Sequence, residues 1–186
     1  MEATKAILSP QEVADAIKSV CGERLAEVRL TEWAEGVKKN KSRQVWLRMD
    51  RDCLRPALKK LITLQYPHLG VISCVDIGDS IELLYHFFIY YGMDHQEIMV
   101  TFTLAVPKSD PTVPTITDLI PGALTSEREK QEMIGLKVVN IPDDRRLFLP
   151  DDFPQGVYPW RKDETGAMEG LVKELWKTGR EKMSNE

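Results

Sequence analysis

The chain has 186 residues, and its 25 Lys and Arg against 29 Asp and Glu give a formal charge of −4 at pH 7. This mild acidity argues against a nucleic-acid-binding protein, because such proteins usually carry a basic patch and a high pI. No apolar run approaches the roughly 20 residues of a membrane-spanning helix, and the first residues lack the apolar core of a signal peptide. We therefore expect an intracellular protein that does not insert into a membrane.

The first half of the chain alternates helical and strand periodicity. Ser9, Pro10 and Glu12 have the spacing of a capping box and predict a helix over about 10–20. Asp52 is expected to cap a second helix, which ends before the next Tyr-Pro pair. Alternating apolar residues predict five strands, over 26–33, 43–49, 71–77, 81–91 and 98–106. This order predicts an α+β fold, in which a mixed or antiparallel sheet of about five strands is covered by two helices.

The composition changes near residue 107, which divides the chain into a sheet domain, 1–106, and an extended docking arm, 107–186, that does not fold independently. Eight of the 11 prolines lie in the arm, and proline cannot donate to a sheet ladder. Ser126 and Glu129 predict a second capping box and a short helix within the arm. Apolar residues at helical spacing predict a terminal helix over 167–178.

Residues that commonly bind cofactors are sparse. Cys21, Cys53 and Cys74 lie far apart, whereas a structural zinc or iron–sulfur site needs four soft ligands, so we interpret them as buried thiols. Asp76 and Asp79 surround a glycine and favour a turn over a metal pair. The glycines form no phosphate-binding loop. We therefore expect no catalytic, cofactor-binding or metal-binding residue in this chain, which favours an interaction subunit over an enzyme.

The arm combines dense, alternating charges with prolines and large apolar side chains. Arginine and aromatic residues are enriched in the cores of protein–protein contacts, so the arm has the composition of an interface. Two alternatives stay open on these grounds. The charges can pair with one another and only hold the arm on the sheet, or the chain can be a free-standing enzyme that uses Glu127, Glu129 or Asp151 as acid and base.

Two motifs in the arm resemble a known family. Residues 126–135, SEREKQEMIG, resemble the signature E-R-E-x-x-[DE]-[ML]-[FY]-G of the NADH dehydrogenase 30 kDa subunit family. Residues 142–153, PDDRRLFLPDDF, and 158–163, YPWRKD, resemble its runs P-D-x-R-R-x-x-L-P-[ED]-[DE]-[WF] and H-P-L-R-K-D. Ile134 replaces an aromatic, and the family's Gly-His-Pro-Asp is shortened to Ile-Pro-Asp. With this loss the chain is more similar to the versions in membrane-bound [NiFe] hydrogenases and formate hydrogenlyase than to those of quinone-reducing complex I.

The resemblance implies a cofactor-free peripheral-arm subunit on the cytoplasmic side of the membrane. Such a subunit binds the large subunit that holds the [NiFe] site or the quinone pocket, near the small subunit that carries iron–sulfur clusters. The equivalent subunit of an NADH or quinone oxidoreductase is the alternative. The resemblance assigns two groups of residues to partner binding. The docking helix contributes Glu127, Arg128, Glu129 and Glu132. The extended contact arm contributes Arg145, Arg146, Pro150, Asp151, Tyr158, Arg161 and Lys162.

Overall fold

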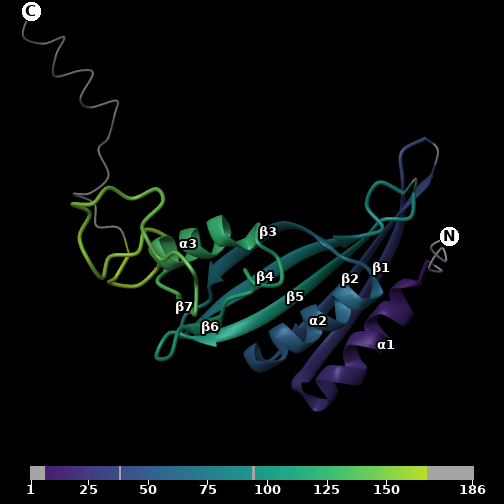
Figure 1. Cartoon of the computed structure of the whole chain (residues 1–186), viewed down its shortest axis with the longest axis horizontal. Coiled ribbons are helices and arrows are strands. Elements are labelled where there is room, and N and C mark those ends of the chain that lie inside the picture. Colours follow the sequence, from purple (N-terminus) through teal and green to yellow (C-terminus); the bar gives the residue numbers. More distant parts are fainter. Residues whose placement is uncertain (1–6, 38, 94, 167–186) are drawn as a thin grey trace, which may run out of the picture.

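The computed structural model describes residues 7–37, 39–93 and 95–166 (Figure 1). The helix predicted over 167–178 lies outside the described residues. Helices and strands follow one another in the expected α+β order. They are α1 (Pro10–Cys21), the short 3₁₀ helix η1 (Gly22–Arg24), β1 (Leu25–Glu35), β2 (Asn40–Met49), the 3₁₀ helix η2 (Arg51–Cys53), α2 (Leu54–Leu64), β3 (His68–Asp76), β4 (Ser80–Ile89), β5 (Ile98–Pro107), β6 (Thr112–Pro114), α3 (Ala123–Ile134) and β7 (Lys137–Val139).

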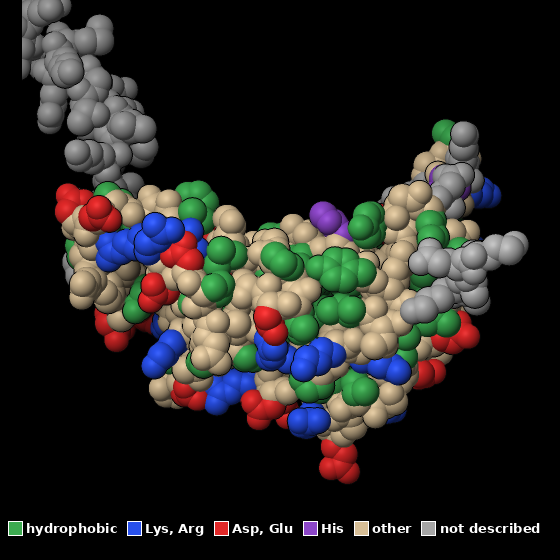
Figure 2. Space-filling model, in the orientation of Figure 1, with side chains coloured by type: hydrophobic (Ala, Val, Ile, Leu, Met, Phe, Trp, Pro, Cys, Tyr) green, Lys and Arg blue, Asp and Glu red, His purple; other side chains and the backbone are tan. Residues whose placement is uncertain are grey.

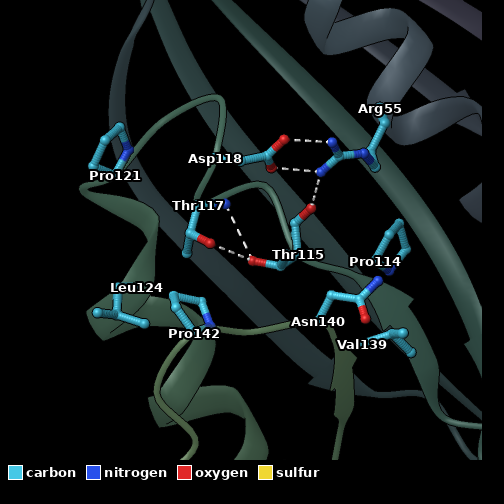
Figure 3. A pocket seen from close by; sticks show the side chains of 10 residues that line it. All are labelled: Arg55, Pro114, Thr115, Thr117, Asp118, Pro121, Leu124, Val139, Asn140 and Pro142. Carbon is cyan, nitrogen blue, oxygen red and sulfur yellow. Dashed lines mark hydrogen bonds and ion pairs between the residues drawn. The ribbon is translucent and has the colours of Figure 1, made fainter.

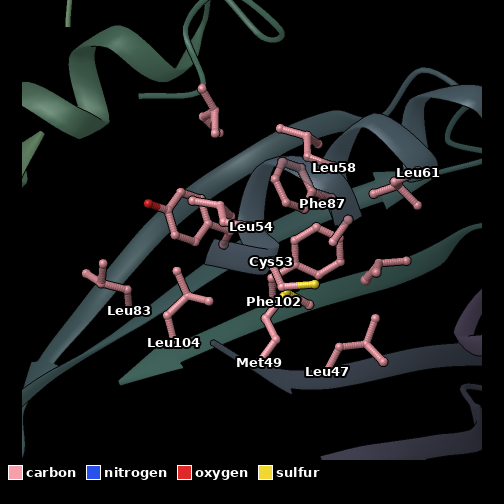
Figure 4. Close-up of a cluster of buried hydrophobic side chains, with 14 of the residues drawn as sticks. Leu47, Met49, Cys53, Leu54, Leu58, Leu61, Leu83, Phe87, Phe102 and Leu104 are labelled. Atoms are coloured by element: carbon pink, nitrogen blue, oxygen red, sulfur yellow. The ribbon is translucent and has the colours of Figure 1, made fainter. Parts of the chain in front are cut away.

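The five long strands form one mixed sheet in the order β1-β2-β5-β4-β3, which confirms the predicted fold class. β2 and β5 are parallel, and the other neighbours are antiparallel. Along β4 every second side chain is buried, so the sheet turns one face to the core. On that face Phe87 and Phe102 meet edge to face at 5.2 Å between ring centroids (Figure 4).

α1 and α2 cover this face of the sheet side by side (Figure 1). Each helix buries one apolar stripe, because residues three and four apart share a helix face. The fully buried side chains of the two stripes include Val13, Ile17, Leu54, Leu58 and Leu61. A third helix, α3, contacts the edge strand β3, so the sheet carries one helix more than the two expected to cover it.

The first predicted helix boundary is confirmed. The Ser9 side chain accepts a hydrogen bond from the Glu12 amide, and the Glu12 carboxylate accepts one from the Ser9 amide at 2.7 Å. These two bonds satisfy donors that the first turn of a helix leaves without partners. Gly22 follows the helix with a positive φ of 57°, which glycine adopts at no steric cost.

The other two predicted caps are wrong. Asp52 lies inside η2, and α2 begins at Leu54 with no side-chain cap. Ser126 lies inside α3, which begins three residues earlier. The Ala123 amide bonds to the Ile120 carbonyl and starts the helix from the preceding turn, so the Ser-x-x-Glu spacing at 126–129 falls within the helix.

Cys21 and Cys53 form a disulfide between the end of α1 and the start of α2, and Cys74 is a thiol. The interpretation of Cys21 and Cys53 as buried thiols is therefore wrong, although both side chains are buried as expected. The disulfide could not be predicted from their separation of 32 residues in the sequence, because only the packing of α1 on α2 brings the two cysteines together. Burial raises the pKa of the Cys74 thiol to about 11.

We expect the variant with both Cys21→Ala and Cys53→Ala to lose about 3–4 kcal/mol of unfolding free energy. A cross-link across 32 residues restricts the unfolded chain by roughly this amount in the chain-entropy model. Denaturant unfolding of the wild type and the double variant measures the difference, with Cys74→Ala as the control. A loss below about 1 kcal/mol would show that the bond adds little beyond the packing of the two helices.

Residues 107–142 pack onto the sheet. β6 and β7 form a parallel pair, and the apolar side chains of this segment join the same core as the sheet. The buried members are Val113, Ile116, Ile120, Ala123, Ile134, Leu136 and Val138. The domain boundary at 107 stays a prediction. Within the described part of the chain, no helix has the length and apolar character required to cross a membrane.

Candidate partner-binding site

The first charged residue of the predicted docking helix, Glu127, is used inside the chain. Its side chain lies in α3 and is only 2% exposed. Its carboxylate accepts hydrogen bonds from the Thr115 hydroxyl at 2.6 Å and from the Ile116 amide at 2.8 Å. Burial raises the pKa of this carboxyl, while the two hydrogen bonds oppose the shift. Glu127 therefore fastens the segment before α3 to the helix.

Glu132, one turn further along α3, shapes the loop that follows β7. Its carboxylate accepts hydrogen bonds from three successive amides, those of Leu147, Phe148 and Leu149, at 3.0, 2.8 and 3.2 Å. Three amides pointing at one carboxylate fix the local backbone, because each amide would otherwise need another acceptor. Glu132 thus determines the shape of the arm around Phe148.

We expect Glu132→Ala to loosen this loop without unfolding the sheet. Three amides lose their acceptor, so the local opening free energy should fall by about 2–3 kcal/mol and exchange of these amides should be roughly 30- to 150-fold faster. Hydrogen exchange at 147–149 measures the effect. Asp144→Ala is the matched control, since Asp144 is an exposed carboxylate in the same loop and its variant should leave exchange unchanged. Equal exchange in wild type and Glu132→Ala would contradict the anchoring role.

Two arginines cross-link the arm through its carbonyl groups. Arg128 in α3 donates to the carbonyls of Arg145 and Arg146 at 2.7 and 2.9 Å and lies 3.3 Å from the Asp143 carboxylate. Arg146 donates to the carbonyls of Pro150 and Phe153 at 2.7 and 3.0 Å. A guanidinium has five donors in a fixed plane, so one side chain can hold several carbonyls at once.

Arg161 and Tyr158 hold the last described turn against the end of α3. Arg161 is 7% exposed at its side chain, donates to the Ile134 carbonyl at 2.5 Å and lies 5.3 Å from the centre of the Tyr158 ring. The Tyr158 ring packs on Gly135, where an added Cβ would come within 2.7 Å. Gly135 also has a positive φ of 75°. Both constraints explain why the signature ends in glycine.

Lys108 joins the arm to the sheet. Its ammonium lies 2.7 Å from the Asp76 carboxylate and 2.5 Å from the Asp163 carboxylate. The buried Asp76 side chain also accepts from the amides of Gly78 and Lys162. The hydrogen bond from Lys108 lowers the pKa of Asp76 to about 2 and lowers that of Asp163 as well. The predicted turn at Asp76 is confirmed, but its contact with the arm was not foreseen.

The remaining predicted residues are exposed, except Glu129, which is half-buried. Arg145 is 81% exposed at its side chain and pairs with Asp143 at 2.8 Å. Pro150, Asp151 and Lys162 are also exposed, and Glu129 pairs with the buried Lys130. Figure 2 shows acidic, basic and apolar side chains together at the end of the molecule formed by the arm.

Two exposed aromatics of the arm were not assigned to partner binding from the sequence. Phe148 is 60% exposed, on the loop held by Glu132. Trp160 is 42% exposed, and its ring centre lies 4.9 Å from the Lys130 ammonium. Both are among the aromatic residues that give the arm the composition of an interface. Whether their side chains are exposed depends on how the arm folds, so the sequence alone did not single them out. We call Arg145, Phe148 and Trp160 the arm surface.

A groove of about 580 Å³ lies between α2 and the segment around β6 (Figure 3). Its charged lining groups bind each other, because Arg55 donates twice to Asp118, at 2.7 and 2.6 Å. The Thr115 and Thr117 hydroxyls bond to each other at 2.8 Å. These polar groups therefore already have partners within the protein. Across the described ranges, no three His, Cys, Asp or Glu residues come together as a metal site.

Comparison with solved structures supports the fold. A chain of the membrane-bound sulfane sulfur reductase (MBS), described as an archaeal respiratory membrane complex, superposes with a TM-score of 0.66. The two chains are 23% identical, and the match covers 90% of this chain and 91% of the other. At this identity the likeness establishes the shared fold.

Sequence comparison identifies the family. The membrane-bound hydrogenase subunit beta of Pyrococcus furiosus is 38% identical over 140 residues, which are 74% of this chain and 80% of that protein. An NADH-quinone oxidoreductase subunit of Moorella thermoacetica is 38% identical over 104 residues, 55% of this chain and 66% of the relative. The family model described as respiratory-chain NADH dehydrogenase, 30 Kd subunit, matches residues 47–169. The resemblance found in the two motifs is thereby confirmed, and the chain belongs to the family of the 30 Kd subunit of respiratory-chain NADH dehydrogenase.

Proposed function

We propose that this chain is a cofactor-free peripheral subunit of a membrane-bound, complex-I-like [NiFe] hydrogenase. It docks on the large catalytic subunit, near the small iron–sulfur subunit, on the cytoplasmic side of the membrane. The partner subunits carry the [NiFe] site and the iron–sulfur clusters, and they perform electron transfer coupled to ion translocation. This chain contributes to the assembly of the complex and to the relative positions of its subunits. The arm is the observation that carries the proposal.

The arm suits docking because its own side chains already hold its shape. Glu132, Arg128 and Arg146 together accept from or donate to seven backbone groups of the arm. A segment that is ordered before binding loses little conformational entropy when a partner docks. The arm surface then presents one arginine and two aromatics, the residue types that carry most binding energy at interfaces.

An acid–base enzyme is less favoured by the positions of its candidate residues. Glu127 is buried behind Thr115, and Glu129 is paired with Lys130. Asp151 is exposed on the arm. A general acid and base must both reach one substrate, and these three side chains have separate surroundings. Their separate surroundings support the proposal that this chain contributes no catalytic residue.

The second candidate is the equivalent subunit of an NADH or quinone oxidoreductase. The identity to the Moorella relative supports it. The hydrogenase assignment is favoured because the Pyrococcus match extends over more of the chain, and because the Gly-His of the quinone-reducing versions is missing before Pro142.

Purification of the tagged chain from solubilised membranes tests the proposal. We expect a large subunit and an iron–sulfur subunit to copurify, with nickel in the complex and neither metal nor flavin in the separated chain. Copurification with quinone-site subunits and no nickel would favour the second candidate. Turnover or a bound cofactor in the pure chain would overturn the subunit assignment.

A further inference from the structure

A buried lysine lies against one of the two exposed aromatics of the arm. Lys130 belongs to α3 and is only 3% exposed, although it carries a charge. Its ammonium pairs with the Glu129 carboxylate and lies 4.9 Å from the centre of the Trp160 ring, within the range of a cation–π contact. A buried ammonium needs such partners, because its removal from water is otherwise costly. The Trp160 ring therefore helps to compensate this buried charge.

The backbone around Trp160 is attached to the end of the same helix. The Trp160 amide donates to the Met133 carbonyl at 2.8 Å. Next to it, Arg161 donates to the Ile134 carbonyl. The last carbonyls of a helix have no partner within the helix, so these two bonds satisfy acceptors that α3 leaves open. Lys130 lies three and four residues before Met133 and Ile134 and thus on the same side of α3, so the ring contact holds Trp160 at a second point.

The exposed part of the Trp160 ring has unused binding capacity. The residue is 42% exposed. Among the residues that the structure describes, none accepts a hydrogen bond from its indole N–H. Indole is a donor only, and a buried indole usually finds an acceptor. A partner that covers this ring should therefore offer an apolar surface together with one carbonyl or carboxylate oxygen.

The two residues of this contact lie outside the motifs of the family. Lys130 occupies a position that the signature at 126–135 leaves unspecified, and Trp160 stands where the run H-P-L-R-K-D has leucine. The contact is therefore a feature of this chain rather than of the family motifs.

We propose that Lys130 is a positioning residue that fixes the Trp160 ring for insertion into an apolar socket of the large subunit, where an oxygen atom accepts the indole N–H. One contact of the ring is already made by the Lys130 ammonium, so the ring lacks only apolar cover and an acceptor. Fixing the ring before docking lowers the entropy cost of binding, because immobilising one such side chain weakens affinity by roughly 2- to 12-fold. The socket rests on the proposed function, whereas the positioning can be measured in the isolated chain.

The ¹⁹F spectrum of the full-length chain labelled with fluorotryptophan tests the positioning. Trp160→Phe identifies the Trp160 signal by its loss. We expect Lys130→Met to shift this signal toward that of free fluorotryptophan and Lys130→Arg to retain it, because arginine keeps a cation on the ring. Lys137→Met, at an exposed lysine of β7, is the matched control and should leave the signal in place. An unchanged Trp160 signal in Lys130→Met would overturn the proposal.

The same spectra control for folding and for cover by the chain itself. The signal of Trp46, on the sheet, should be the same in all variants. If Lys130→Met changes it, Lys130→Gln repeats the test with a polar side chain at the buried position. In the wild-type chain a soluble paramagnetic agent should broaden the Trp160 signal. A signal that the agent does not reach would show that this chain already covers its own ring, and the socket would then be excluded.

A double-mutant cycle on binding of the large subunit tests what the positioning achieves. Lys130→Met should raise the Kd about 3- to 10-fold in the wild-type chain and leave it unchanged in Trp160→Ala, because a positioning residue acts only through the ring that it holds. Equal effects in both backgrounds would indicate a purely structural lysine and overturn the proposal. Benzothienylalanine at position 160, in which sulfur replaces the indole N–H, should raise the Kd about 5- to 30-fold, since an acceptor in the socket loses its donor.

These outcomes distinguish the inference from the proposed function. If the wild-type chain binds no large subunit, the proposed function fails and the socket fails with it, while the ¹⁹F shift still decides whether Lys130 holds the ring. If the wild-type chain binds but the Lys130→Met and benzothienylalanine variants bind equally well, the proposed function stands and this inference is wrong.

Discussion

Replacing Phe148 and Trp160 together with alanine is expected to weaken binding of the chain to its large partner subunit by at least about 100-fold. Central aromatic residues of an interface cost about 2–4 kcal/mol each when truncated, which corresponds to roughly 30- to 1,000-fold per residue. Both rings are well exposed, so neither truncation opens a cavity in the sheet core. Titration of the partner subunit with wild-type and variant chains measures the change in Kd.

Tyr91→Ala is the matched control for this prediction. Tyr91 is 48% exposed, comparable to Trp160, but it follows β4 and its ring lies tilted against that of His68, 5.5 Å away between centroids and away from the arm. We expect its Kd to stay within about threefold of the wild-type value, in keeping with the small effects of most positions outside hot spots. If Tyr91→Ala weakens binding as much as the double variant does, the arm surface is not the site of docking.

Asp76→Ala should cost about 2–4 kcal/mol of unfolding free energy and release the arm. The side chain is buried, and its loss removes one of the two carboxylates of Lys108 and the acceptor of the Lys162 and Gly78 amides. Leaving a buried partner uncompensated is what makes such a truncation costly. Denaturant unfolding measures the loss. Asp79→Ala, in the exposed part of the same turn, should stay within about 0.5 kcal/mol.

The same contact predicts the pH dependence. The pKa of Asp76 is about 2 in the folded chain, below its ordinary value of 3.8, because Lys108 and two amides favour the ionised form. A carboxyl with a lowered pKa contributes stability above its unfolded pKa, and this contribution disappears as the pH falls from about 4 through about 2. The stability difference between wild type and Asp76→Ala should therefore shrink over this window. A difference that is constant from pH 6 to pH 2 would contradict the ion pair.

Glu127 acts with the opposite sign. Its raised pKa means that its burial is least costly when the carboxyl is protonated, below its ordinary pKa of 4.5. Its contribution therefore falls as the pH rises above that value. The contributions of Asp76 and Glu127 to stability can be distinguished by measuring the unfolding free energy of a variant of each residue across the same pH range.

The order of helices and strands could be predicted from the sequence because it depends on local periodicity. The capping box at Ser9 and the alternation along β5 each involve neighbours in the chain. The parallel pairing of β2 with β5 could not be predicted, because it joins residues more than 50 positions apart. The failed cap at Ser126 shows the limit of a local motif, since the turn before α3 supplied an earlier start.

The charged residues of the arm could be found from their motif, but their partners could not. Glu132 and Arg128 fit the alternative in which charges hold the arm on the protein, because they bond to its backbone. Arg145 and Phe148 point outward and are available to another chain. Their role at a partner stays a prediction. Whether a charged residue binds the backbone of the arm or faces outward depends on loop geometry. The spacing of residues in the sequence does not contain this information.

The contact of Lys108 with Asp76 and Asp163 was missed for the same reason. The three residues are 32 and 55 positions apart and meet only after the arm has folded back on the turn between β3 and β4. Each residue alone resembles an ordinary turn or surface charge. The sequence offered one signal for this contact. Lys108 directly follows a strand, and that strand ends beside the acidic turn at Asp76.

A structure of the native complex, determined by cryo-electron microscopy, tests the central claim most directly. The claim is that the folded arm binds another polypeptide. We expect Arg145, Phe148 and Trp160 to lie buried against the large subunit, with the internal bonds of Glu132 and Arg146 retained. The claim would be contradicted if these three side chains faced solvent, or lined a cleft that holds a small molecule with no second chain beside it.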